Sequence, residues 1–389
     1  MNNKKMILGI LLFAVIIGAG IGISKLINPA DPAAQNTSDP AGKNPETVTV
    51  YGAVGGGKEN FLADPDVNRI MAEKYGISVQ NDPWSNGKMI RNELTYTDKN
   101  DGSTGTVDFA FFSDQRYYEY YQTEAKEGEA PRLRKQRGEI ILNTPIVFYS
   151  WKEVVDVLEQ EEIVTERDGV FYISDMNKLL EYITSEKKWK DIGLNIYGNI
   201  NIGSTDPVTS SPGATYYGLL ASILSDGQLT SQTLSDIMPR LQQFYKQSGF
   251  MNNTPADLFD QYLRTGYGTK PIIVDYEKSM VDFAINNPEG YASVKDRVRI
   301  LYPEPTIWNS HCIISFTDNG TKFIEALNDN EIQEIAFNRY GFRIGLSGGQ
   351  YDVKSVGVDG LPQEIVSVVP GLKMDTYNLI IEGLKEVEF

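Results

Sequence analysis

Apolar and polar positions follow two different periods along most of the chain. Residues 47–51 and 107–112 read as short strands, whereas residues 66–75 place Val67 and Ile70 at the spacing of a helix that buries one face. The same succession of short apolar runs and helical runs continues to the C-terminus. Strands that alternate with helices predict an α/β fold in which mostly parallel sheets are flanked by helices.

The first 25 residues carry a different pattern. Residues 6–24 are 19 consecutive uncharged residues, nearly all apolar, between Lys5 and Lys25. At 1.5 Å per residue this stretch is about 28 Å long, close to the hydrocarbon thickness of a bilayer. We therefore predict a transmembrane signal anchor over residues 1–25, with the N-terminus in the cytoplasm because lysines precede the span. A cleaved signal peptide, cut within residues 30–34, is the alternative.

Residues 26–45 are rich in Pro, Ala, Asn and Asp, which predicts an extended linker outside the cell. Residues 46–389 remain for a folded body, enough for one domain with two lobes. Aromatic residues make up 11% of the chain, far more than a disordered chain contains. The prediction is a single-pass cell-membrane protein with an extracellular body.

Composition argues against several classes of function. The net charge of −16 disfavours a nucleic acid as partner. The single cysteine, Cys312, cannot form an intrachain disulfide and is interpreted as a buried apolar residue. The single histidine, His311, provides no cluster for a metal and no spare base for a Ser-His-Asp triad. We expect no cofactor, no metal site and no enzyme, and we interpret His311 as a strand residue without a catalytic task.

A glycine-rich turn follows the first predicted strand. Residues 52–59, GAVGGGKE, are one residue short of a phosphate-binding loop, because Glu59 stands where a Mg²⁺-binding hydroxyl is required. ATP is also scarce outside the cell, so nucleotide hydrolysis is disfavoured. The three glycines before Lys58 predict instead a backbone turn that approaches a ligand closely. Lys58 either adds a positive charge to that ligand site or is a solvated loop lysine.

Open α/β sheets bind ligands at the loops that follow their strands, where helix N-termini point. Four loops here have that position: the glycine-rich turn and residues 82–87, 111–115 and 203–213. The fourth loop carries five hydroxyl side chains just before an apolar helix. Hydroxyls and free amides at the positive end of a helix dipole predict a site for an anion or a polar ligand. The alternative for one of its serines, Ser210 or Ser211, is that it only caps the helix.

At this fourth loop the sequence resembles a known family. GSTDPVTSSPGATYYGLLASIL is similar to the ligand loop and helix of type 2 periplasmic (extracellular) solute-binding proteins. Four further segments resemble that family in its order: LNTPIVFYSW its strand into the second lobe, PIIVDYEKSMVDFA its Tyr-Glu loop, RILYPEPTIWNSHCIISF its returning hinge strands, and NRYGFRIG its Tyr-Gly-Phe-Arg ending. The chain departs from the family at Pro212, which interrupts a serine–glycine pair, in lacking a lipoprotein cysteine, and after Arg343, where no segment matches.

The resemblance implies two α/β lobes joined by two crossing strands, with a small solute held between the lobes by hinge closure. It assigns residues 46–145 and 304–389 to lobe I and residues 146–303 to lobe II. It also implies an ABC permease, or a sensor or other membrane complex, as partner. Together the loops and the resemblance give these candidate ligand-binding residues: Gly55, Gly56, Gly57, Lys58, Trp84, Ser85, Ser113, Asp114, Thr205, Asp206, Ser210, Ser211, Gly213, Tyr276 and Glu277.

Three classes of function remain open at this point. The chain is a solute receptor, an extracellular hydrolase that uses a loop serine, or an adhesion or assembly module that kept the fold without a ligand. The solute is also open. Hydroxyls, glycine amides and Lys58 suit an oxyanion such as molybdate, sulfate or phosphate, which we favour. Trp84, Tyr216 and Tyr276 suit the wall of a site for an amino acid, a peptide or a sugar.

Overall fold

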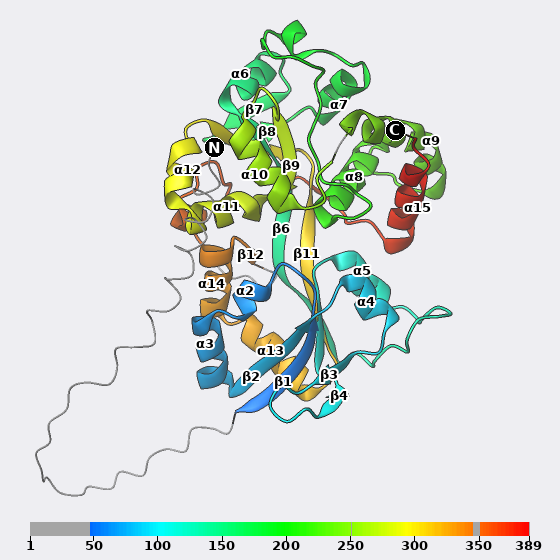
Figure 1. Ribbon diagram of the computed structural model, residues 1–389, viewed down its shortest axis with the longest axis vertical. Coiled ribbons are helices and arrows are strands. Elements are labelled where there is room, and N and C mark those ends of the chain that lie inside the picture. The colour runs from blue at the N-terminus through cyan, green and yellow to red at the C-terminus, as the bar shows by residue number, and fades with distance from the viewer. Residues whose placement is uncertain (1–46, 250, 345–350, 389) are drawn as a thin grey trace, which may run out of the picture. The chain divides into compact units, whose positions relative to one another are not determined.

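The computed structural model describes residues 47–249, 251–344 and 351–388, which Figure 1 shows as a ribbon. The predicted anchor of residues 6–24 and the predicted linker of residues 26–45 lie outside the described residues. Among the residues that are described, none of the helices is long and apolar enough to span a membrane.

Two long strands run side by side from one lobe into the other (Figure 1). They are β6 (Arg137–Trp151) and β11 (Thr306–Ser315), which pair in antiparallel orientation. The two ends of each strand belong to different apolar cores, because Leu142 and Ile313 pack into one core and Ile146 and Ile307 into the other. These are the strands that the sequence predicts to cross between the lobes.

The first lobe surrounds a core that contains Val50, Phe111 and Phe323. Strand β1 pairs in parallel with both β2 and β5, so the turns that follow these strands meet at one edge of the sheet. In chain order the elements of this lobe are β1 (Val48–Val54), α2 (Glu59–Leu62), α3 (Pro65–Tyr75), β2 (Ile77–Pro83), α4 (Asn86–Arg91), β3 (Thr95–Thr97), β4 (Thr104–Thr106), β5 (Phe109–Phe112), α5 (Gln115–Tyr121), α13 (Asp318–Leu327), α14 (Asn330–Tyr340) and β12 (Arg343–Ile344).

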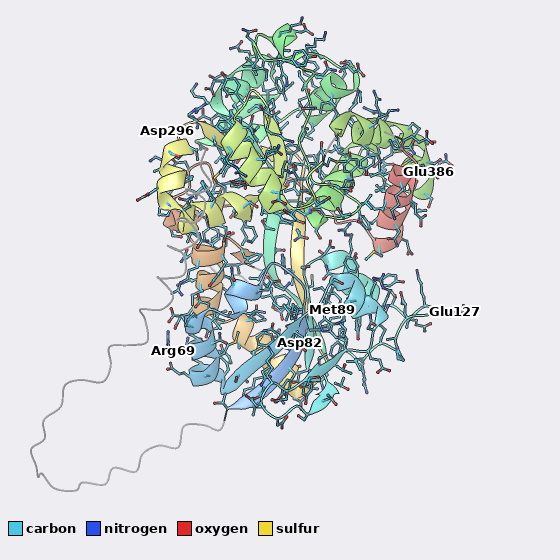
Figure 2. All side chains as sticks on the ribbon, viewed as in Figure 1. Arg69, Asp82, Met89, Glu127, Asp296 and Glu386 are labelled. Atoms are coloured by element: carbon cyan, nitrogen blue, oxygen red, sulfur yellow. The ribbon has the colours of Figure 1, made fainter. Side chains whose placement is uncertain are left out.

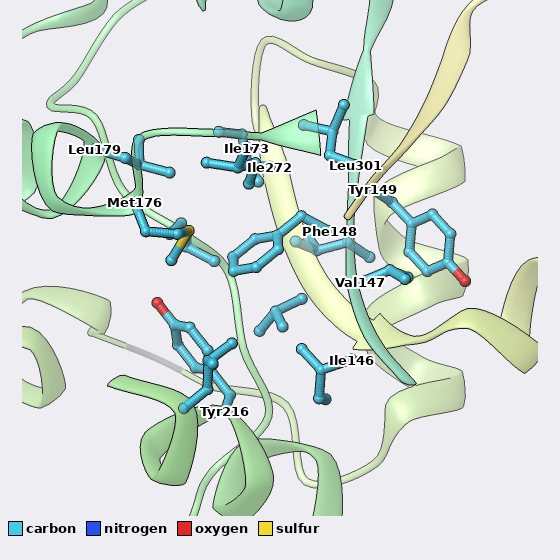
Figure 3. Packing of buried hydrophobic residues seen from close by; sticks show 14 of the residues in the cluster. Ile146, Val147, Phe148, Tyr149, Ile173, Met176, Leu179, Tyr216, Ile272 and Leu301 are labelled. Atoms are coloured by element: carbon cyan, nitrogen blue, oxygen red, sulfur yellow. The ribbon is translucent and has the colours of Figure 1, made fainter. Parts of the chain in front are cut away.

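The second lobe has its own core, in which Phe148 of β6 points towards Met176 and Tyr216 while Tyr149 points to the opposite side of the strand (Figure 3). Every residue from Ile141 to Trp151 is buried, so this end of β6 has apolar neighbours on both faces. In chain order the elements of this lobe are α6 (Lys152–Gln160), β7 (Val164–Arg167), β8 (Val170–Ile173), α7 (Met176–Thr184), η1 (Trp189–Ile192), α8 (Ser211–Leu224), α9 (Ser231–Ser248), α10 (Pro255–Thr265), β9 (Ile272–Tyr276), α11 (Glu277–Asn286), α12 (Pro288–Val294), β10 (Val298–Pro303), η2 (Val353–Val356), β13 (Val368–Val369) and α15 (Met374–Lys385).

The sheet is mixed, and the prediction of mostly parallel sheets is wrong. One 11-stranded sheet contains the path β2-β1-β5-β11-β6-β10-β8-β7. Strand β6 pairs in antiparallel orientation with β9, β10, β11 and β12. The physical reason is that the chain leaves the first lobe along β6 and returns along β11, so the two adjacent strands run in opposite directions. The predicted strand before the fourth loop, residues 195–203, contains only isolated bridges such as that between Gly203 and Ile273.

The C-terminal residues pack differently from the sequence assignment, which places residues 304–389 in lobe I. The core of the second lobe includes Val353, Leu361, Ile380 and Leu384. Helix α15 lies against α9, where a Cβ at Gly383 would come within 2.5 Å of the Met238 sulfur (Figure 1). This contact buries the apolar face of α15, and that burial stabilises the packing of the segment on the second lobe.

Figure 2 shows side chains throughout both lobes. Charged residues that it labels, such as Arg69, Glu127, Asp296 and Glu386, lie at the periphery and are exposed. Labelled Met89 is fully buried in a third, smaller apolar cluster that also contains the β5 residue Phe112. The charged residues thus surround apolar cores, as expected for a body in water.

Candidate functional site

A cleft of about 640 Å³ lies between loops of the two lobes, beside strand β11. One wall comes from the turns that follow β1, β2 and β5 in the first lobe. The other comes from the loop before α8 and from the first residues of α10 and α11 in the second lobe. The residues on these walls include Gly56, Gly57, Glu59, Trp84, Ser85, Asn86, Ser113, Thr209, Ser210, Ser211, Thr254, Tyr276, Lys278, Ser279, Asn309, His311 and Phe342.

Five of the described helices begin at this cleft, namely α2, α4, α8, α10 and α11. In the second lobe the residues that precede the helices are Ser210, Thr254 and Tyr276, and all three line the cleft. The first N–H groups of a helix have no partner within it, and the helix dipole makes that end positive. Three long helices that begin at one cleft therefore create a site for a negative or strongly polar group.

Ser210, and not Ser211, is the N-cap of α8, and its hydroxyl makes no capping hydrogen bond. The N–H of Gly213 donates instead to Thr205 Oγ1 at 3.0 Å. This approach requires glycine, because a Cβ on Gly213 would lie 2.2 Å from the Thr205 carbonyl oxygen. Ser210 Oγ is buried on the cleft wall and has no hydrogen-bond partner among the described residues. Its hydroxyl therefore keeps an unused hydrogen-bonding capacity in a residue that lines the cleft.

The glycine-rich turn forms part of the opposite wall. Gly56 and Gly57 line the cleft, whereas the N–H of Gly55 donates to the Phe111 carbonyl at 2.8 Å and ties the turn to β5. Gly57 has a φ of +86°, a conformation that favours glycine. The N–H of Gly57 donates to the Glu59 carboxylate at 2.8 Å. The turn thus presents its backbone to the cleft, with one of its amides already bound by a side chain.

Lys58 lies beneath this turn and not on the cleft wall. Its side chain is 0% exposed, and its Nζ lies 4.7 Å from the centroid of the Phe111 ring and 3.5 Å from the Gly56 carbonyl oxygen. Burial lowers the pKa of Lys58 to about 7, although the charge of Glu59 acts in the opposite direction. The alternative that Lys58 is a solvated loop lysine is therefore excluded.

His311 connects Lys58 to the cleft. Its Nδ1 lies 3.3 Å from Lys58 Nζ, and its Nε2 lies 3.3 Å from the side-chain nitrogen of Asn309. His311 and Asn309 both line the cleft. Burial, followed by the charges of Lys58 and Lys278, lowers the pKa of His311 well below its usual value, so the imidazole is neutral. The sequence interpretation of His311 as a strand residue is correct in its place on β11 but missed its position in the cleft.

Three predicted residues of the first lobe also lie on the cleft wall, namely Trp84, Ser85 and Ser113. Ser85 Oγ accepts a hydrogen bond from the N–H of Lys88 at 3.2 Å and caps α4. Ser113 Oγ accepts one from Asn86 Nδ2 at 2.9 Å. Lys88 Nζ lies 3.6 Å from the centroid of a Trp84 ring, so this indole carries a cation on one face.

Two predicted residues complete the second-lobe wall, Ser211 and Tyr276. The carbonyl of Ser211 accepts a hydrogen bond from Thr215 Oγ1 at 2.9 Å. The Tyr276 hydroxyl lies 3.4 Å from that same Thr215 oxygen, and burial raises the pKa of Tyr276, so its side chain is a neutral phenol. Tyr276 therefore offers the cleft an aromatic surface with one polar end.

The structure gives the remaining predicted residues partners away from the cleft wall. Asp114 pairs with Arg116, and both line a small cavity behind β11. Glu277 is fully buried and accepts two hydrogen bonds from Arg343, with Nε to Oε1 at 2.7 Å. The Asp206 carboxylate accepts a hydrogen bond from the backbone of its own loop at 2.9 Å. As described above, Thr205 and Gly213 bind each other.

Several residues of the cleft were missed by sequence reasoning, among them Thr254, Lys278, Asn309 and His311. A Thr-Pro pair before a helical run is a signal for a helix start, and it marks Thr254. Asn309 and His311 occupy alternate positions of a strand and must share one face, but only the pairing of β11 shows which face meets the cleft. Within residues 47–249, 251–344 and 351–388, no group of three or more His, Cys, Asp or Glu is placed to hold a metal ion.

No protein-family model matches this sequence, and no curated protein matches it either. Solved structures do. A Bordetella parapertussis protein assigned to the extracellular solute-binding proteins gives a TM-score of 0.56 at 13% identity, over 87% of this chain and 97% of that chain. Apo ferric ion-binding protein A of Pasteurella haemolytica gives 0.54 at 12% identity, over 87% and 97%. The substrate binding protein of an ABC transporter from Agrobacterium tumefaciens gives 0.51 at 15% identity, over 89% and 95%.

These three likenesses extend over both lobes and almost the whole length of each matched chain, and they agree with the paired crossing strands β6 and β11. At such low identities they establish the fold alone. The chain therefore has the type 2 periplasmic-binding-protein fold of the extracellular solute-binding proteins.

Proposed function

We propose that this protein captures a small polar solute with an anionic group in the cleft between its lobes. The observation that carries this proposal is the hydroxyl of Ser210. It is buried at the N-terminus of α8 without a hydrogen-bond partner among the described residues, and it lines the cleft at which α10 and α11 also begin. A buried hydroxyl without a partner is unfavourable, and a bound solute would supply the missing hydrogen bond.

The charges around the cleft favour an anion. Each helix N-terminus carries the equivalent of roughly half a positive charge. Lys278 adds a positive charge on the second-lobe wall. Lys58 lies behind the wall residue His311 and contacts its ring. The opposing charge is Glu59, whose carboxylate is already bound by the N–H of Gly57. A volume of about 640 Å³ also accommodates an organic anion larger than a single oxyanion.

Binding is better supported than hydrolysis. A serine nucleophile needs a base within hydrogen-bond reach, at about 2.6–3.2 Å. Ser210 Oγ has no such partner among the described residues, and the ring nitrogens of His311 face Lys58 and Asn309. We therefore assign the protein a receptor function without turnover.

The receptor would deliver its solute to an ABC-type permease or to a sensor in the same membrane. The fold supports this assignment, since the matched structures include the substrate binding protein of an ABC transporter. The uncharged stretch of residues 6–24 supports anchoring to the cell membrane with the body outside. An assembly module that binds no solute is the competing function on the same fold.

The proposal is tested by native mass spectrometry of the full-length protein, followed by thermal unfolding with a panel of solutes. The panel contains oxyanions, carboxylates, amino acids and neutral sugars. A ligand present at 100 times its Kd stabilises the fold by about 2.7 kcal/mol and raises the Tm. We expect an anionic solute to be retained or to raise the Tm. A rise with neutral sugars alone contradicts the anion, and no rise with any solute favours the assembly module.

A further inference from the structure

The lysine of the glycine-rich turn is buried without an opposite charge. Lys58 is 0% exposed, and no carboxylate among the described residues forms an ion pair with its Nζ. Its contacts there are the Gly56 carbonyl at 3.5 Å, the Phe111 ring and Nδ1 of His311 at 3.3 Å. A buried ammonium with so few partners is unfavourable, so the charged and the neutral forms of Lys58 are close in free energy. Small changes nearby decide which form is present.

The contact between Lys58 and His311 couples the protonation state of Lys58 to the cleft, because His311 lines the cleft. An ammonium group only donates hydrogen bonds, so a charged Lys58 requires Nδ1 of His311 as acceptor and places the ring proton on Nε2. Nε2 lies beside the Asn309 amide, whose oxygen can accept that proton once the amide is turned by 180°. His311 and Asn309 line the cleft. Hydrogen bonds thus connect the buried lysine to the solute space.

The groups around this pair do not neutralise it. The Glu59 carboxylate favours the charged form of Lys58 but is bound to Gly57 and exposed. Burial raises the pKa of Cys312, the other titratable neighbour of Lys58, so that this thiol is uncharged. On the cleft side, the positive charge of Lys278 disfavours a proton on His311. Burial lowers the pKa of Lys58 to about 7 even though the Glu59 carboxylate acts in the opposite direction.

We propose that the cleft binds its anionic solute together with one proton from solvent, and that the Lys58–His311 pair holds this proton. The inference rests on the proposed function, because only a negative solute supplies the missing opposite charge. An opposite charge at about 4–6 Å shifts a pKa by about 1–3 in favour of the charged form. A neutral solute has no such effect. Proton uptake therefore identifies the solute as an anion and Lys58 as a determinant of that specificity.

The size of the effect follows from the pKa of Lys58. At pH 8 a group with a pKa of about 7 is roughly one tenth protonated. A bound anion that raises this pKa by about 2 makes it roughly nine tenths protonated, an uptake of about 0.8 proton. Between pH 9 and pH 7 the affinity for the anion then rises about 25-fold. Anions that do not titrate in this range give the cleanest measurement.

The experiment is isothermal titration calorimetry at pH 8 on the full-length protein in detergent. Sulfate, molybdate and succinate are the probes, and each is titrated in Tris and in HEPES, whose ionisation enthalpies differ. The difference between the two observed enthalpies, divided by the difference between the ionisation enthalpies of the buffers, gives the number of protons taken up. We expect about 0.8 for a probe that binds and about 0 for Lys58→Met, with weaker binding and no rise in affinity from pH 9 to pH 7.

Two further variants keep the test decisive. His311→Gln preserves a polar side chain but removes the imidazole, and we expect the uptake to fall. Lys278→Met also removes one positive charge from the cleft, so binding weakens while the uptake stays near 0.8. Binding by the unaltered protein without proton uptake overturns the inference and leaves the proposed function intact, as does uptake that persists in Lys58→Met. Any anionic solute that raises the Tm is added to the probes, and if no anion of the whole panel binds, the proposed anionic solute and this inference fail together.

Discussion

Replacement of Ser210 by alanine separates a ligand-binding hydroxyl from a helix cap. In the structure Ser210 Oγ forms no capping bond and has no partner among the described residues, while Thr205 Oγ1 binds the Gly213 N–H at 3.0 Å. The variant removes a buried hydroxyl that has no partner in the described part of the empty fold and is therefore unfavourable there. We therefore expect Ser210→Ala to weaken solute binding without destabilising the protein.

The magnitude follows from the cost of an unmade hydrogen bond. A buried hydroxyl without a partner costs about 1–3 kcal/mol, and a solute that supplies the partner recovers that free energy. Ser210→Ala should thus lower the affinity by about 5- to 150-fold. The same removal should raise the free energy of unfolding of the empty protein by up to about 3 kcal/mol. Both effects have one origin and should appear together.

The assays are calorimetric titration with the solute that raises the Tm most, and urea unfolding of the empty protein. The matched control is Thr230→Ala at the N-cap of α9, whose Oγ1 accepts a hydrogen bond from the N–H of Thr233 at 3.2 Å. That residue caps its helix and is absent from the cleft wall, so the control should lose about 1 kcal/mol of stability and no affinity. If Ser210→Ala behaves like Thr230→Ala, the hydroxyl is only a cap and the reasoning is wrong.

Three other predictions concern charge and topology. Arg343→Met should destabilise the fold by about 3–5 kcal/mol in urea unfolding, because it leaves the buried carboxylate of Glu277 unpaired. The control is Lys126→Met, which breaks the exposed ion pair with Asp375 and should cost less than about 1 kcal/mol. Equal losses of stability in the two variants would contradict the argument from burial. Lys58 has a folded pKa of about 7, below the unfolded value of about 10.4, so the cost of burying its charge is complete below pH 7 and disappears as the pH rises towards 10.4. Lys58→Met should therefore stabilise the empty protein by up to about 4 kcal/mol at pH 7 and progressively less at pH 9 and 10, and a gain independent of pH would refute this account. Protease added to intact cells should cut within residues 26–45 and release a fragment that begins near residue 46; protection of the body would refute the outward orientation.

The sequence by itself determined the class of fold and much of the candidate cleft. The long apolar run that becomes β6 is β-rich over residues 139–149, and local pattern suffices to identify such a strand. Helix starts after strands are equally local, which is why Gly56, Trp84, Ser210 and Tyr276 could be proposed before their positions were known. All four line one cleft in the structure. Their role in binding a solute remains a prediction.

Only the tertiary structure decided the direction of the strands, the packing of α15 and the partners of individual polar side chains. Antiparallel pairing of β6 depends on where the chain returns, which no local pattern encodes. Lys58 and His311 are separated by 253 positions, so their contact at 3.3 Å exists only because β1 and β11 flank β5 in one sheet. The sequence suggests Asp114 and Glu277 as ligand-binding residues. In the structure the carboxylate of Asp114 pairs with Arg116, and that of Glu277 pairs with Arg343. Whether a polar side chain faces a solute or a partner depends on which of its neighbours folding brings within hydrogen-bond distance.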